Sequence, residues 1–250
     1  MFLKHPFTLM VIFTFLLTGC VTNTHKTDGP SVGPGFSSSF FKTEVVEAGV
    51  GKPKLEVIIP VFDPGFPEDP DEYEDEGIWP ELRRAEANRF AYKLKEAMDA
   101  NGSFGAVRVT PDKTATGDLY VLGTIVQSNG EEVEIDLTVV VISGDVLMNV
   151  SLEHEVIEAF HNDLRNDGKD AYDPVFALAA KAIADELRYY SAKELADLQY
   201  LTDMRFGASF SEAPFKPYIK VEGNEVKLIS KMSEADPMYH RIMSIRTRDQ

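Results

Sequence analysis

The chain has 250 residues, with 41 Asp and Glu against 25 Lys and Arg, and a formal net charge of −16. This length accommodates one large domain or a domain with an extension. So negative a charge argues against binding to nucleic acid and against broad electrostatic adhesion to anionic lipid, both of which require clustered Lys and Arg.

Residues 1–20 combine a positive charge, a short apolar run and a cysteine. Lys4 supplies a positive charge, and the apolar run from Phe7 to Leu17 is shorter than the roughly 20 residues of a transmembrane helix. Leu17-Thr18-Gly19-Cys20 resembles a lipobox, which implies cleavage before Cys20 and acylation of the thiol and the new amino terminus. Cys20 is the only cysteine and has no internal disulfide partner. An incidental cysteine after an ordinary signal (residues 1–19) is the alternative.

The resemblance also implies a location. Val21, not Asp, follows Cys20, which in Gram-negative lipoproteins of this kind favours the outer membrane. We expect a lipid anchor in the outer membrane and a domain facing the periplasm, with the inner membrane and the cell surface as alternatives. Residues 20–53 are rich in Thr, Ser, Gly and Pro and are expected to form a flexible tether with a reach of about 30 Å.

Residues 54–200 are predicted to form an α/β sandwich in the order β-α-β-β-β-β-α. The apolar run Leu55–Phe62 predicts a strand buried on both faces, although Pro60 argues against a central position. Pro80 predicts a helix start, and apolar residues recur at helical spacing as far as the stop signal Asn101-Gly102. Further strands are predicted at 104–110, 119–126, 133–141 and 146–156. Alternation and tight turns in the last three favour a meander, hence a mostly antiparallel sheet with helices on one face.

Asp173-Pro174 predicts the start of a long helix whose apolar stripe continues to Leu198. Residues 201–250 are expected to form a C-terminal extension. Two short apolar segments flank Glu222–Glu225, which predicts a hairpin, and Asp236-Pro237 predicts a short helix after it.

The order of these parts resembles envelope α/β modules. An apolar strand ending in Pro60-Val61-Phe62-Asp63, a helix, and the later stretch Asp118-Leu119-Tyr120-Val121-Leu122-Gly123 are similar to parts of the curli-secretion lipoprotein and of the TolB amino-terminal domain. The resemblance covers roughly residues 54–200 and concerns the fold. It implies a non-catalytic role in envelope assembly, transport or scaffolding. The acidic loop and the C-terminal extension depart from it.

The acidic segment 63–81 contains nine Asp or Glu and no Lys or Arg. Its candidate partner-binding residues are Tyr73, Glu74, Asp75, Glu76 and Trp79. An exposed Trp79 would anchor a partner, whereas a buried Trp79 would cap the core. A solvated loop, a divalent-cation site and a carboxylate pair for hydrolysis are the other interpretations of the acidic side chains. These side chains are Glu68, Asp69, Asp71, Glu72, Glu74, Asp75 and Glu76.

Two other segments contain metal-ligand residue types. Residues 162–170 resemble an EF-hand loop, but with Gly168 at the sixth position Pro174 falls at the twelfth, where Glu is needed, so a turn is predicted. His154 and His161 lie near several glutamates without a His-Glu-x-x-His pattern. This favours a histidine at the sheet margin over a metal or acid/base site.

The sequence contains no phosphate-binding loop, nucleophile elbow or dinucleotide-binding turn. We therefore expect no catalytic residue, no metal and no cofactor. The predicted function is that of a lipid-anchored envelope protein that binds another envelope protein or polymer in a scaffolding, assembly or transport role. A divalent-cation-responsive binding module and a carboxylate-dependent hydrolase are the alternatives.

Overall fold

The computed structural model describes residues 51–158, 160, 166, 168–222 and 225–249, and the backbone of 35–38. The signal sequence, Cys20 and most of the predicted tether lie outside the described residues. The elements in chain order are β1 (Gly35–Ser38), β2 (Val57–Pro60), α1 (Glu72–Asp75), α2 (Pro80–Asn101), β3 (Val107–Thr110), β4 (Leu119–Ser128), β5 (Glu132–Val141), β6 (Val146–Glu155), α4 (Asp173–Leu187), α5 (Ala192–Phe210), β7 (Ile219–Glu222), β8 (Glu225–Leu228) and α6 (Pro237–Asp249).

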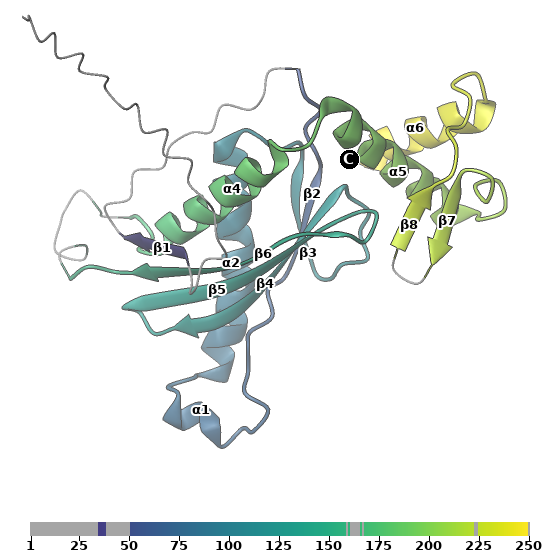
Figure 1. The fold of residues 1–250 in the computed structure, drawn as a ribbon. Coiled ribbons are helices and arrows are strands. Elements are labelled where there is room, and N and C mark those ends of the chain that lie inside the picture. Colours follow the sequence, from purple (N-terminus) through teal and green to yellow (C-terminus); the bar gives the residue numbers. More distant parts are fainter. Residues whose placement is uncertain are drawn as a thin grey trace, which may run out of the picture. The chain divides into compact units, whose positions relative to one another are not determined.

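The main sheet has the strand order β1-β6-β5-β4-β2-β3, which confirms the α/β fold (Figure 1). β4, β5 and β6 form the expected antiparallel meander. However, β2 pairs in parallel with both β3 and β4, and β1 pairs in parallel with β6. The sheet is therefore mixed, and the prediction of a mostly antiparallel sheet was wrong. The physical reason is that α2 connects β2 to β3 as a crossover helix, which returns the chain to the same end of the sheet.

β2 occupies a central position between β3 and β4. Val57, Ile58 and Ile59 are fully buried, as the unbroken apolar run predicts. Pro60 does not prevent this position, because it is the last residue of the strand and the pairing with β4 involves Val57 and Ile58. The expectation that Pro60 argues against a central position is not met, for this reason.

β1 lies within residues 20–53, the segment assigned to a flexible tether. Its backbone pairs with Leu152–Glu155 of β6. A strand edge offers unpaired backbone groups to any extended segment that reaches it. The expectation of an unstructured tether therefore does not hold for these four residues.

The two helices α2 and α4 lie together on one face of the sheet, as predicted (Figure 1). Phe90 of α2 is central to the core beneath them and makes edge-on ring contacts with Phe62, Tyr172 and Phe176 at centroid distances of 6.4, 6.0 and 5.2 Å. Gly123 of β4 allows this packing, since a Cβ atom there would lie 2.4 Å from the Phe62 ring. The apolar side chains of α2 and β4 thus determine how closely the helices pack on the sheet.

The predicted long helix after Asp173 consists of two helices. Ser191 begins the second one with a capping box, in which its side chain accepts from Glu194 N and the Glu194 side chain accepts from Ser191 N. α5 then runs across the predicted domain boundary at residue 200. Leu201 and Met204 of α5 belong to a second apolar cluster, made with Ile142 in the turn after β5 and with the C-terminal extension.

The predicted elements of the extension are confirmed. β7 and β8 form the antiparallel hairpin, and Pro237 is the first residue of α6. Phe215 and Ile242 pack against Gly207 of α5, where a Cβ atom would lie 2.5 Å from the Phe215 ring. The extension therefore has its own small core, centred on α5.

Candidate functional site

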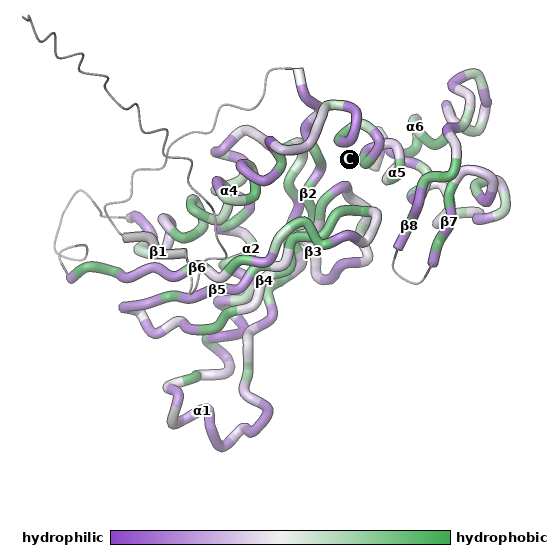
Figure 2. The backbone as a smooth tube through the Cα atoms, in the orientation of Figure 1, coloured by the Kyte–Doolittle hydropathy of each residue, from purple (hydrophilic) through white to green (hydrophobic). Residues whose placement is uncertain are grey.

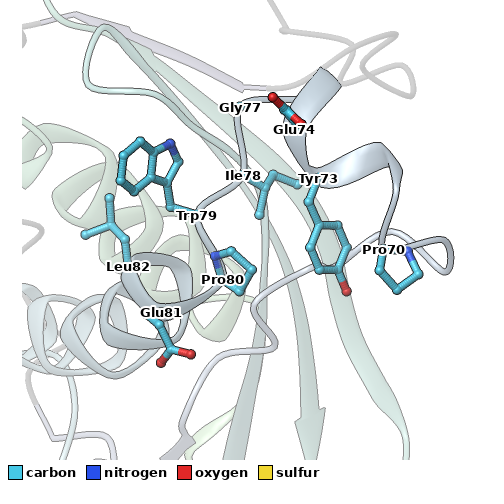
Figure 3. Close-up of a pocket in the computed structure, with 9 residues that line it drawn as sticks. All are labelled: Pro70, Tyr73, Glu74, Gly77, Ile78, Trp79, Pro80, Glu81 and Leu82. Atoms are coloured by element: carbon cyan, nitrogen blue, oxygen red, sulfur yellow. The ribbon is translucent and has the colours of Figure 1, made fainter.

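An apolar hollow of about 450 Å³ lies at the junction of the acidic segment and α2. Trp79 and Leu82 lie side by side at one edge of it (Figure 3). The Tyr73 ring lies across the hollow from them (Figure 3). Trp79 is 75% exposed and Leu82 is 58% exposed, whereas the neighbouring Ile78 is buried. Trp79 is therefore exposed to solvent and does not cap the core.

The backbone around Trp79 explains why it points outward. Ile78 N donates to Tyr73 O at 2.7 Å, which fixes the residue before Trp79 against α1. Trp79 has an extended backbone and is the N-cap of α2, and its carbonyl accepts from Arg83 N at 2.9 Å. Because successive side chains of an extended segment point in opposite directions, burying Ile78 exposes Trp79.

The start of the acidic segment is attached to the sheet. Asp63 N donates to Gly123 O at 2.8 Å, and Ile125 N donates to Asp63 O at 2.9 Å. Gly65 follows with a φ of +64°, and a Cβ atom there would lie 1.9 Å from Ile125 O. Only glycine fits this close approach.

Ring contacts also connect the acidic segment to α1 and α2. The Phe66 ring stacks on Tyr73 with a centroid distance of 5.3 Å, and the Arg84 guanidinium lies over Phe66 at 5.1 Å. Tyr73 is thus held in place as one wall of the hollow.

Around the hollow the surface is acidic. The α1 region is mostly hydrophilic (Figure 2), and its described carboxylates are exposed at Glu68, Asp69, Asp71, Glu72, Glu74 and Glu76. The Asp75 side chain lies outside the described residues. Within the described part of the chain, no group of three or more His, Cys, Asp or Glu is arranged to hold a metal ion. The structure thus combines an apolar centre with a negatively charged rim.

The structure places His154 away from this hollow. His154 is fully buried in β6, and its Nε2 lies 2.9 Å from Ala171 O. His161 and most of the EF-hand-like segment lie outside the described residues. Of that segment, Asp170 pairs with Arg89 of α2 and accepts from Tyr172 N at 3.1 Å. These contacts connect the segment before α4 to the helical layer.

A buried ionic cluster joins the α/β domain to α6. The Arg246 guanidinium contacts Glu56 at 3.0 Å and Asp118 at 3.8 Å, and it also pairs with Asp203 of α5. Arg108 adds a second contact to Glu56 at 3.3 Å. Glu56, Asp118, Asp203 and Arg246 line a hollow of about 200 Å³. The cluster, which we call the Arg246 cluster, is defined as Glu56, Arg108, Asp118, Asp203 and Arg246.

Burial dominates the electrostatics of the Arg246 cluster. Burial raises the pKa of Asp118, although hydrogen bonds from Thr202 and from Glu56 N and the charge of Arg246 oppose it. Burial also raises the pKa of Asp203 to about 6; Arg246 lowers it, while Asp118 and Glu56 raise it further. One Asp118 oxygen accepts from Glu56 N at 2.8 Å, and the other has no hydrogen-bond partner within the described part of the chain. The excess of carboxylates attracts Arg246 and thereby holds α6 to the domain.

No motif in the sequence indicates the Arg246 cluster. Its members are separated by up to 190 residues, as in the pair of Glu56 with Arg246. Asp118 does stand immediately before an apolar strand, which is an unusual place for a carboxylate. No local pattern, however, identifies its distant partners.

Comparison of the chain with protein-family models and with curated proteins finds no significant match. Among the described residues, no helix has both the length and the apolar character needed to cross a bilayer.

Proposed function

We propose that this chain is a lipid-anchored cell-envelope protein that binds a partner protein through the hollow at Trp79. The anchoring part rests on the lipobox-like Leu17-Thr18-Gly19-Cys20 and on the apolar run before it. The anchor places the domain at the outer membrane, facing the periplasm. The partner-binding role is a non-catalytic one in scaffolding, assembly or transport.

The observation that carries the binding role is the exposure of Trp79. A tryptophan that is 75% exposed, beside a Leu82 that is 58% exposed, leaves a large apolar surface in water. Covering about 100 Å² of such surface yields about 2.5 kcal/mol. Tryptophan residues in pockets at the centre of an interface are typical binding hot spots. The hollow therefore has the composition of an interface centre.

The charge around the hollow defines the partner's chemistry. Glu74 and Glu81 line the hollow together with Trp79, and the exposed Glu72 belongs to the adjoining helix α1. A matching surface has an apolar side chain for the hollow and Lys or Arg residues around it. We therefore infer a protein segment with a basic rim, rather than an acidic polymer, as the partner. Association should weaken with added salt, because exposed charges are screened.

Affinity purification of the full-length protein from membranes tests this proposal. Trp79→Ala should abolish recovery of the partner, while the matched variant Tyr189→Ala, which removes another exposed aromatic side chain, should retain it. Cys20→Ser should release the protein from membranes and leave its circular dichroism spectrum unchanged. Equal partner recovery with Trp79→Ala and Tyr189→Ala would contradict the binding role. Membrane retention of Cys20→Ser would contradict the anchor.

A further inference from the structure

A third hollow, of about 590 Å³, lies on the sheet face opposite α2 and α4. Leu119 and Val121 of β4 point into the core beneath the helices, so the alternate residues Tyr120 and Leu122 face the other way. Together with Val140 of β5 they form an apolar floor. The walls come from the connection between β3 and β4 and from α5.

The connection between β3 and β4 is fixed in place above this floor. The Tyr120 hydroxyl accepts from Gly117 N at 3.2 Å and donates to Ala115 O at 3.0 Å. Arg108 donates to Thr116 O at 3.2 Å. The pocket is therefore formed before any ligand arrives, and binding needs little ordering of the chain.

Two cations, Lys113 and Arg205, line the pocket, and no carboxylate does. Within the described part of the chain neither cation forms an ion pair, and Arg205 donates to Ile142 O at 3.4 Å. Of the carboxylates nearest in sequence to these two cations, Asp112 accepts from Thr114 N at 2.8 Å, and Asp203 pairs with Arg246. Two unneutralised cations in one pocket are unusual in a chain with a net charge of −16.

We propose that this pocket binds a small organic anion, a carboxylate or phosphate carried on an apolar body. Its volume lies within the range of small-molecule sites, about 300–1,000 Å³. The apolar floor of Tyr120, Leu122 and Val140 covers the body of the ligand. Lys113 and Arg205 bind the anionic group through charge-assisted hydrogen bonds. This site is separate from the Trp79 hollow, and the proposal does not depend on partner binding.

Fluorescence titration of the full-length protein with anilinonaphthalene sulfonate, an aromatic anion, tests the proposal. We expect one saturable site from which decanoate displaces the probe and decyltrimethylammonium does not. The double variant Lys113→Gln/Arg205→Gln should weaken binding at least about tenfold, because it removes both charged donors to the anionic group. Lys193→Gln/Lys216→Gln, which removes two exposed lysines outside the pocket, is the matched control and should leave the affinity unchanged.

A second variant separates loss of the site from loss of the fold. Leu122→Glu places a negative charge on the floor and should abolish binding, while thermal melting checks that the protein remains folded. Equal affinities for the double variant and its control would overturn the proposal. So would displacement of the probe by decyltrimethylammonium as readily as by decanoate. Loss of probe binding with Trp79→Ala alone would also overturn it, because the probe would then be bound in the hollow at Trp79.

Discussion

The Arg246 cluster should make the stability of this protein depend on pH through Asp203. Its pKa of about 6, against 3.8 as the ordinary value, means that the folded state holds a proton that the unfolded state releases between these two values. Stability from this group therefore rises as pH falls through about 6 and is complete below about 4. The difference corresponds to at most about 3 kcal/mol, at about 1.4 kcal/mol for each pH unit.

Asp203→Asn removes this titration and leaves a side chain of the same shape. We expect the unfolding free energy of the parent protein, minus that of the variant, to increase by up to about 3 kcal/mol between pH 8 and pH 4. Urea denaturation followed by far-ultraviolet circular dichroism at fixed ionic strength measures it. Asp99→Asn removes the exposed partner of Lys95 and corrects for the general loss of negative charge. Parallel pH profiles for the parent and Asp203→Asn would refute the reasoning.

Three further predictions concern the fold and the acidic segment. Arg246→Ala leaves the carboxylates of Asp118 and Asp203 without a positive partner and should lower the free energy of unfolding by about 3–5 kcal/mol. The rate of amide hydrogen exchange should rise more in α6 than in α2. An equal rise in both helices would contradict the role assigned to Arg246. Gly123→Ala should destabilise the protein by about 1–3 kcal/mol, because the new methyl group meets the Phe62 ring; thermal melting measures this, and Thr124→Ala on the other face of β4 is the control. Calcium should leave the melting temperature unchanged, because the described carboxylates of residues 63–81 do not converge on a metal position; a rise that saturates with calcium would instead support a cation-responsive module.

Much of the fold follows from short-range patterns in the sequence. Strict alternation predicts the meander of β4, β5 and β6, and Pro80 and Gly102 bound α2 correctly, with Gly102 at a φ of +74°. These features are local, because each depends on residues within one turn or strand. The two short apolar segments that flank Glu222–Glu225 likewise predict the hairpin of the extension.

Long-range pairing could not be predicted in the same way. The buried run at Val57–Ile59 is compatible with a neighbour in either direction, and the choice depends on the crossover through α2. The break before α5 did have a local signal, the capping box of Ser191 and Glu194, which the continuous apolar stripe obscured.

The candidate sites differ in how far the sequence reveals them. Trp79 and the acidic residues beside it stand out in the sequence, but Ile78 and Trp79 are adjacent and equally suited to burial. Only the structure shows that Ile78 is buried and that Trp79 is exposed. The Arg246 cluster and the pocket of Lys113 and Arg205 have members from distant segments, so they become apparent only in the folded chain.

Site-specific photo-crosslinking at Leu82 in membranes from cells that produce the protein tests the central claim most directly. Leu82 borders the hollow beside Trp79, so a photoreactive side chain there should form one discrete adduct with a partner protein. The same side chain at Val146, an exposed position on β6, is the matched control and should form no such adduct. Absence of an adduct at position 82, or the same adducts from both positions, would contradict a partner site at Trp79.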